Sequence, residues 1–255
     1  MKIYQIVFSP TGGTQRTADI LTAKTENCVN VVDLTNPQND YSALNLKQDD
    51  IAIIAVPSYG GRVPRLAAER LSKINGGQAY CVVVCVYGNR AYEDTLIELY
   101  DIAEQSNFRV ISAVAAVAEH SIIHQYAAGR PDKQDEEELS GFAEQIFEKI
   151  KKPVSDMSVL HIPGNRPYKK YGKGGLIPKA DDRCTGCGLC AEKCPEQAIS
   201  KENPKNTDSE KCIYCMRCVS QCPQSARKVN EAAVSAIAQA IKETCLARKN
   251  NELYI

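Results

Sequence analysis

The stretch Cys184-Thr-Gly-Cys187-Gly-Leu-Cys190-Ala-Glu-Lys-Cys194-Pro195 places four cysteines at intervals of three, three and four residues and ends with a proline. The same spacing recurs 28 residues later, from Cys212 to Pro223. Eight of the 12 cysteines therefore fall within one short segment. Nothing in the sequence indicates an exported chain, so we expect these thiols to stay reduced and to bind metal rather than form disulfides.

The spacing predicts two [4Fe–4S] clusters. Three cysteines three residues apart on a tight loop reach three corners of one iron–sulfur cube, and the fourth, before proline, turns toward the neighbouring cube. The predicted ligands are Cys184, Cys187, Cys190 and Cys222 for one cluster, and Cys212, Cys215, Cys218 and Cys194 for the other. Two zinc sites of four cysteines each are the alternative, but zinc does not need a third cysteine followed by Cys-Pro in both repeats.

This segment resembles the bacterial two-cluster ferredoxins over roughly residues 178–228, and all eight cysteines meet the family pattern. The resemblance implies a compact fold with pseudo-twofold symmetry and two one-electron centres close together. Gly186 and Gly188 suit loops whose amides approach the cluster sulfurs. The insert 196–211 departs from the family pattern, and its polar stretch 203–206 predicts a surface turn.

The first 150 residues predict an α/β fold. Apolar runs rich in Val, Ile and Ala, without strict alternation, are typical of strands buried on both faces. The predicted strands are 2–8, 29–34, 51–56, 80–87 and 109–116. Amphipathic segments predict helices at 14–25, 64–74, 91–105 and 133–151. This order predicts a doubly wound five-stranded parallel sheet, which binds ligands at the carboxyl ends of its strands.

The loop Ser9-Pro10-Thr11-Gly12-Gly13-Thr14 follows the first strand and combines hydroxyls, glycines and a helix N-terminus, as a phosphate cradle does. It lacks the Gly-Lys-Ser/Thr of a nucleotide-hydrolysing loop and is not Gly-x-Gly-x-x-Gly. An ordinary turn with Thr14 as the helix N-cap is the alternative. Two later loops each place a tyrosine, Tyr59 or Tyr92, beside glycines, where a flat ring could be held by stacking.

These three loops resemble those of the flavodoxins across about residues 1–150. The resemblance implies non-covalent FMN, with its phosphate in the first loop and its ring between Tyr59 and Tyr92. Gly13 replaces the family's usual Asn, and Asn89 replaces an Asp while keeping a hydrogen bond to the pyrimidine edge. The implied FMN-binding residues are Ser9, Thr11, Gly12, Gly13, Thr14, Pro57, Ser58, Tyr59, Gly60, Gly88, Asn89 and Tyr92.

Three further residues near these loops are candidates for the chemistry. Arg62 and Arg90 are expected either as cations that raise the flavin potential or as solvated surface residues. His120 follows the fifth strand, and its imidazole is a candidate proton donor to a reduced product. A hydrogen-bonded loop histidine is the alternative.

The chain divides into four expected parts, namely a flavodoxin-like domain (1–151), a Pro/Gly/Lys-rich arm (152–177), a ferredoxin domain (178–228) and a C-terminal helix (229–255) capped by Asn230. Residues 1–150 carry a net charge of −7 and residues 151–255 one of +7, so the two halves are expected to attract each other.

Composition excludes several classes of function. Zero net charge argues against a nucleic-acid binder, and the longest apolar run, 79–87, is far shorter than a membrane span. The chain enters an apolar strand at once, so we expect no secretory signal and a cytoplasmic location. No nicotinamide-binding fingerprint is present.

The loops 57–61, 87–90 and 119–121, together with the arm stretch 166–170, resemble the flavodoxin–ferredoxin fusion family, redox proteins found mainly in anaerobes. The resemblance implies electron transfer between two clusters and FMN, with a redox partner protein as donor or acceptor. An FMN-dependent reductase of a small molecule, such as a quinone, is one alternative. A redox-sensing module that binds a partner without turnover is another.

Overall fold

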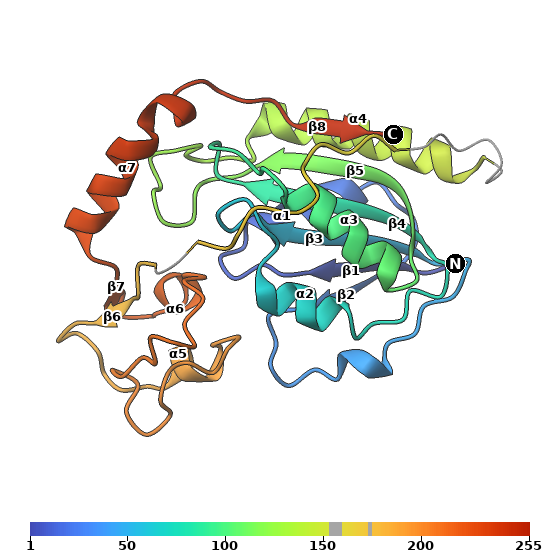
Figure 1. The fold of residues 1–255 in the computed structure, drawn as a ribbon. Coiled ribbons are helices and arrows are strands. Elements are labelled where there is room, and N and C mark those ends of the chain that lie inside the picture. Colours follow the sequence, from blue (N-terminus) through green and yellow to red (C-terminus); the bar gives the residue numbers. More distant parts are fainter. Residues whose placement is uncertain (153–159, 173–174) are drawn as a thin grey trace.

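A computed structural model describes residues 1–152, 160–172 and 175–255. Its main sheet has the strand order β2-β1-β3-β4-β5-β8 (Figure 1). The first five strands pair in parallel, and the order 2-1-3-4-5 is the flavodoxin-like arrangement. They are β1 (Ile3–Val7), β2 (Val29–Asp33), β3 (Ile51–Pro57), β4 (Tyr80–Tyr87) and β5 (Arg109–Val117). The predicted α/β fold is confirmed, with strand ends within one residue of expectation.

Helices cover both faces of this sheet. On one face lie α1 (Gly13–Thr22) and α4 (Lys133–Ile150), which bury Leu21 and Leu139 against the strands. On the other lie α2 (Arg65–Leu71) and α3 (Thr95–Gln105), after the short 3-10 helix η1 (Tyr41–Ala43). The two layers leave only the strand ends open, so loops there are the places where a ligand can reach the backbone.

The sequence did not predict the sixth strand, β8 (Glu252–Tyr254). It pairs antiparallel with β5, and the Asn251 side chain accepts the N–H of Val117 at 2.9 Å. Three residues are too few to give a strand pattern, and only their pairing with a distant strand makes them one. β8 covers the edge of β5 that a five-stranded sheet would leave unpaired.

The arm lies on the sheet domain. Arg166 makes a two-pronged ion pair with Asp101, at 2.7 and 2.5 Å, and the backbone N–H of Asn165 donates to Asp94. In Figure 1 this segment runs across α3 toward the cysteine-rich segment. Residues 153–159 and 173–174 of the predicted arm, including Pro153 and Gly174, lie outside the described residues.

The cysteine-rich segment forms a small separate unit beside the strand ends (Figure 1). It contains two four-residue helices, α5 (Leu189–Glu192) and α6 (Arg217–Ser220), and an antiparallel pair, β6 (Lys179–Ala180) with β7 (Arg227–Lys228). The predicted turn at 203–206 closes with a bond from the Asn206 N–H to the Asn203 carbonyl.

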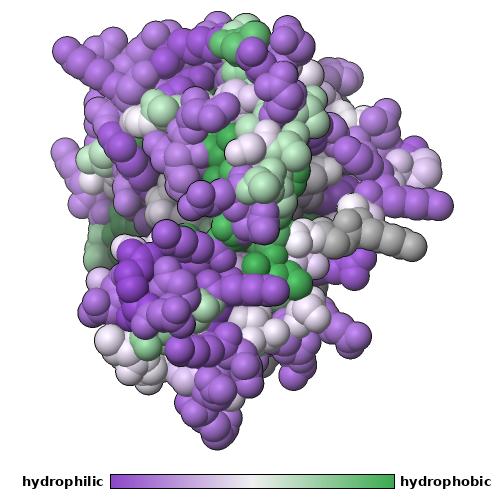
Figure 2. All heavy atoms as spheres, turned by 90° about the vertical axis from the view of Figure 1, so that its left-hand side faces the viewer, coloured by the Kyte–Doolittle hydropathy of each residue, from purple (hydrophilic) through white to green (hydrophobic). Residues whose placement is uncertain are grey.

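The last helix, α7 (Glu231–Cys245), begins at the predicted cap, where the Asn230 side chain accepts the Ala233 N–H. It ends at Cys245, so it covers only part of the expected helix at 229–255. Cys245 is buried while Ile237 is exposed, and Figure 2 shows a band of hydrophobic residues through this side of the molecule.

Three cysteines outside the two repeats lie in or next to strands of the main sheet. Cys81 and Cys85 are buried in β4 as small apolar residues, whereas Cys28 is exposed just before β2. Within the described ranges, none of the helices has the length and apolar character needed to cross a membrane.

A buried carboxylate ties the C-terminal segment to the sheet domain. Asp135 is fully buried and accepts bonds from the Arg130 guanidinium at 2.8 and 2.5 Å and from the Asn251 amide at 3.0 Å. Burial opposes ionisation, but these donors lower the pKa of Asp135. The pair therefore stays charged at neutral pH.

We predict that Asp135→Asn lowers the free energy of unfolding by about 3–5 kcal/mol, because it leaves the buried Arg130 charge without its partner. Glu136→Gln is the matched control. It breaks a half-exposed pair with Arg16 and should cost at most about 1 kcal/mol. Anaerobic urea unfolding measures both, and equal losses would contradict the prediction.

Candidate functional site

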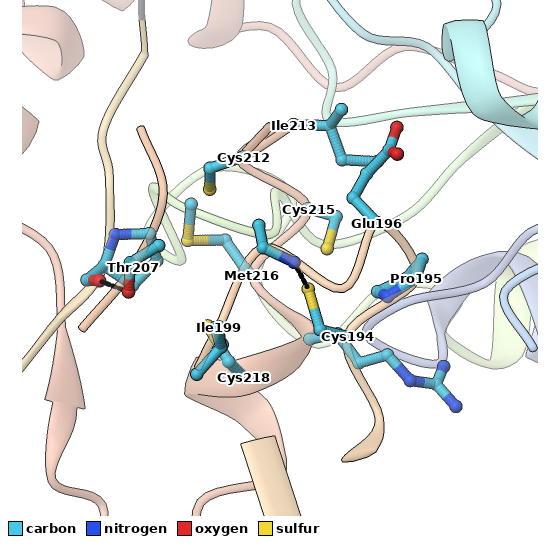
Figure 3. A pocket seen from close by; sticks show the side chains of 13 residues that line it. Cys194, Pro195, Glu196, Ile199, Thr207, Cys212, Ile213, Cys215, Met216 and Cys218 are labelled. Atoms are coloured by element: carbon cyan, nitrogen blue, oxygen red, sulfur yellow. Dashed lines mark hydrogen bonds between the residues drawn. The ribbon is translucent and has the colours of Figure 1, made fainter. Parts of the chain in front are cut away.

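Each cysteine repeat contributes to two hollows in the segment beside the sheet. One is lined by Cys194, Cys212, Cys215 and Cys218, which we call the inner set (Figure 3). The other is lined by Cys184, Cys187, Cys190 and Cys222, which we call the outer set. Each hollow thus joins three cysteines of one repeat to the fourth cysteine of the other. These are the groupings that the spacing predicts.

The two repeats use the same backbone shape to present their sulfurs. The residues before α5 and α6, Gly188 and Met216, are both left-handed, with φ of 76° and 61°. Gly186 and Tyr214 match in the same way, with φ of 72° and 56°. Because only glycine adopts this region freely, the sequence revealed the loop shape in the first repeat but not in the second.

The fourth cysteine of each repeat also has a matching environment. The N–H of Ala198 donates to Cys194 Sγ at 3.3 Å, shown by a dashed line in Figure 3, and the N–H of Ala226 donates to Cys222 Sγ at 3.3 Å. Such donors favour the thiolate that a metal cluster needs. Burial acts to raise the pKa of the Cys222 thiol, but hydrogen bonds from backbone N–H groups outweigh it and lower the pKa.

Burial distinguishes the sets. It raises the pKa of the Cys215 and Cys218 thiols in the inner set to about 12, whereas Cys187 of the outer set is exposed. In residues 1–152, 160–172 and 175–255, no three His, Cys, Asp or Glu side chains are placed to hold a single metal ion. The cysteines instead surround open hollows, which suits a cluster.

The predicted phosphate loop leads into α1 without a side-chain cap. Its N-cap is Gly12, with φ of 98°, so the alternative in which Thr14 caps the helix is wrong. The Ser9 hydroxyl accepts the Gln15 N–H at 2.9 Å. The N–H groups of Gly13 and Thr14 have no acceptor in the part of the chain that the structure describes. Free amides at a helix N-terminus suit an anionic phosphate.

Tyr59 stands on a tight turn at the end of β3. Its N–H and carbonyl exchange bonds with Arg62 at 2.9 and 3.3 Å, across Gly60 and Gly61. Both glycines have positive φ, and a Cβ on Gly61 would lie 2.0 Å from Glu93 Oε2. Tyr59 is half-buried, and burial raises the pKa of its hydroxyl well above the usual range. The thiols of Cys215 and Cys212 add to that rise.

The other ring-side residues after β3 lie as follows. Pro57 ends the strand, and the Ser58 hydroxyl bonds to that of Thr95 at 2.7 Å. Gly60 is exposed, and a Cβ there would meet nothing within 4 Å. The backbone of this loop is therefore open, whereas the Ser58 side chain already has a partner.

Asn89 is placed differently from the expectation that it faces the flavin. Its amide donates to the carbonyls of Cys245 and Ala247, at 2.8 and 2.9 Å, and it is almost fully buried. Its side-chain oxygen accepts the Lys249 N–H at 3.2 Å. All these partners lie in the C-terminal segment, about 160 positions away, so no local pattern could reveal them.

Tyr92 also differs from the expected stacking residue. Its hydroxyl bonds to Glu252 at 2.7 Å and to Tyr254 at 2.8 Å, and its ring meets that of Tyr87 edge to face at 5.2 Å. Tyr92 therefore holds β8 in place. Of the two tyrosines expected to stack on the flavin, Tyr92 is therefore engaged elsewhere.

His120 packs against Gly88, where a Cβ would lie 2.6 Å from the imidazole ring. Its Nδ1 accepts the N–H groups of Ile122 and Ile123, each at 3.2 Å, so the ring proton is on Nε2. Burial, and secondly the charge of His124, lowers its pKa. His120 is thus a neutral, hydrogen-bonded loop histidine.

Arg62 is neither a free cation beside the strand ends nor a solvated residue. Its guanidinium makes two bonds of 2.7 Å to Glu98, and it lies between the rings of Tyr171 and Tyr168, at 4.1 and 5.0 Å. It anchors the arm to the sheet domain. Arg90 pairs with Glu93 at 2.8 Å.

Two further arginines, which the sequence did not single out, join the cysteine-rich segment to the sheet domain. Arg70 of α2 donates to the Pro195 carbonyl at 2.7 Å. Arg217 of α6 donates to the Ser9 carbonyl at 3.3 Å and lies 3.8 Å from Asp33. No sequence signal marks them, because each acts on a carbonyl more than 100 positions away.

We predict that His120 titrates below the ordinary value of about 6.5, because its buried ring loses solvation when it is charged. A histidine-selective NMR titration, with His120→Gln to assign the resonance, measures this pKa. Because the pKa of His120 is lower in the folded protein than in the unfolded chain, the neutral ring stabilises the fold above pH 6.5. This stabilisation is lost as the pH falls below 6.5. A pKa at or above 6.5 would refute the prediction.

Parts of the chain are similar to known proteins. Residues 177–223 match the family model of the 4Fe-4S dicluster domain. Similar solved structures include a flavodoxin from Streptococcus pneumonia TIGR4, 25% identical with a TM-score of 0.43, over 58% of this chain and 99% of that one. Flavodoxin 1 from Bacillus cereus is 18% identical, with a TM-score of 0.42 over 58% and 98% of the two chains. A flavodoxin from the domain Archaea is 14% identical, with a TM-score of 0.43 over 60% and 100%. The chain thus combines an α/β sheet with the flavodoxin-like strand order and a cysteine-rich segment that matches the 4Fe-4S dicluster model.

Proposed function

We propose that this chain is an electron-transfer protein that holds two [4Fe–4S] clusters and FMN and exchanges electrons with a redox partner protein. The observation that carries the proposal is that the two cofactor sites adjoin. Arg217, next to Cys218 of the inner set, donates to the Ser9 carbonyl in the phosphate loop. Electron exchange needs such closeness, and one chain provides it without a diffusional encounter.

The cysteine sets support clusters rather than zinc. A zinc ion draws four sulfurs to about 2.3 Å from one point. Each set here instead lines a hollow that three cysteines of one repeat share with the fourth cysteine of the other. Four thiolates around such a space suit an iron–sulfur cube, whose amide-facing loops are the left-handed turns at 186 and 188 and at 214 and 216.

The open loops support FMN. The free N–H groups of Gly13 and Thr14, with the backbone at Gly12 and the hydroxyls of Ser9 and Thr11, would hold its phosphate. Tyr59 and the backbone of the other ring-side loop residues would hold the ring; these residues are Pro57, Ser58, Gly60 and Gly88. Asn89 and Tyr92 are not included, because their side chains bind the C-terminal segment.

The bound groups would supply complementary chemistry. Each cluster exchanges one electron, while FMN takes up two electrons together with protons, so the set converts between one-electron and two-electron transfer.

We also propose domain limits of 1–151 for the sheet domain, 152–177 for the arm, 178–228 for the dicluster domain and 229–255 for the C-terminal segment. The last part does not stand alone, because β8 belongs to the main sheet. The main sheet therefore includes a strand from the C-terminal segment.

A cofactor count tests the proposal. Protein purified without oxygen should contain about eight irons, eight sulfides and one FMN per chain. Two zinc ions without sulfide would overturn the clusters. Iron and sulfide without flavin would overturn the FMN site and leave the sheet as a docking domain.

We predict that Gly12→Ala weakens FMN binding at least about tenfold, which corresponds to about 1.4 kcal/mol. The added Cβ is strained at φ of 98° and would shift the loop amides that face the phosphate. Gly129→Ala is the control, because Gly129 has φ of 74°, has equally open surroundings and lies outside the proposed site. Flavin fluorescence during titration of the flavin-free protein measures both affinities, and equal weakening would contradict the prediction.

A further inference from the structure

The two cysteine sets differ in what surrounds them. Each set has the same internal geometry, but the dicluster domain meets the sheet domain through the loops of the inner set. Residues next to or between its cysteines make these contacts, namely Pro195, Ile213 and Arg217. The domain is therefore docked in one orientation.

Arg70 forms the first of these contacts. It is 8% exposed, and its guanidinium spans the carbonyls of Leu34 and Pro195, both at 2.7 Å. It also lies over the Tyr41 ring at 5.6 Å. A buried charge that donates to two carbonyls on different domains fixes their separation, because losing either bond leaves the charge poorly solvated.

Arg217 forms the reciprocal contact from the dicluster domain. It begins α6, between Met216 and Cys218, and reaches the Ser9 carbonyl at the start of the phosphate loop. Asp33, at the end of β2, lies 3.8 Å from the same guanidinium. Its Nε atom is buried and has no partner among the described residues.

Apolar residues lie at the same contact. Ile213, between Cys212 and Cys215, packs against the core of the sheet domain. Met216, which lines the inner hollow, is buried. The inner set thus lies at the contact between the two domains.

The outer set lies away from this contact between the domains. Cys187 is exposed, as are its neighbours Thr185 and Gly186. Of the residues that line its hollow, none makes a hydrogen bond or ion pair with residues 1–152 in the described structure. Solvent and other proteins can approach it directly.

We propose that the two sets have different roles and that Arg70 and Arg217 hold the orientation that separates them. The cluster held by the inner set would exchange electrons with the flavin, and the cluster held by the outer set would exchange them with a one-electron redox protein. This inference rests on the proposed function. The partner loses one electron for each electron that the outer set's cluster gains, and two transfers match the two electrons that a flavin takes up. Reverse flow uses the same residues.

Differential labelling tests the orientation. Anaerobic holoprotein is treated with limiting ferricyanide, and freed cysteines are alkylated and identified by mass spectrometry alongside an iron count. We expect outer-set cysteines to be labelled first, at a stage when about four irons remain per chain. Arg70→Gln and Arg217→Gln should each speed inner-set labelling several-fold. Arg183→Gln is the control, because Arg183 pairs with Asp181 on the exposed side and should leave the order unchanged.

If both sets of the wild-type protein were labelled at one rate, or the inner set first, that result by itself would overturn the proposed orientation. Unchanged labelling in both arginine variants would overturn their role in holding it. A preparation without iron would overturn the proposed function, and this inference with it.

Matched cysteine variants test the roles. Cys187→Ala removes an outer-set ligand and Cys215→Ala an inner-set ligand, and an iron count confirms that each keeps about four irons. With reduced methyl viologen, a small donor able to reach either cluster, flavin reduction should persist in Cys187→Ala and slow at least tenfold in Cys215→Ala. The opposite order would overturn the assignment.

Discussion

The junction between the second cysteine loop and the strand ends of the sheet is the constraint on which the rest depends. Two arginines from opposite sides, Arg70 and Arg217, donate to backbone carbonyls across it. The opposite net charges of the two halves, −7 and +7, favour their approach, and the two proposed clusters with their thiolates would reduce the positive side to about +3. Long-range attraction does not fix an orientation. The orientation is instead set by the hydrogen bonds to the Pro195 and Ser9 carbonyls.

The parallel sheet explains why the junction lies at this edge. All five parallel strands end there, so the loops after β1, β3, β4 and β5 converge within one region of the molecule (Figure 1). The strand order reverses direction between β1 and β3, next to the N-terminus of α1, and doubly wound sheets bind their ligands at such a reversal. A dicluster domain docked at this point faces the phosphate loop and Tyr59 together. The topology thus determines both where FMN would bind and where electrons would have to arrive.

The sequence predicted what local pattern determines. Strands were placed within one residue because buried parallel strands are continuous apolar runs, and the cysteine groupings followed from spacing alone. The sequence did not reveal the positions of side chains whose hydrogen-bond partners lie far away along the chain. Asn89 and Tyr92 fit a flavin loop by position, yet their side chains bind residues 245–254. Arg62 appeared free because Glu98 and Tyr171, which bury it, lie on a helix and an arm elsewhere in the chain.

The central claim is that electrons pass between the clusters and the flavin inside one chain. The most direct test is a flash-photolysis experiment that delivers one electron per chain to the clusters and follows flavin absorbance at protein concentrations about tenfold apart. Transfer within the chain predicts one rate constant at every concentration, because both sites belong to the same molecule. A rate proportional to concentration, or clusters that stay reduced beside an oxidised flavin, would contradict the account.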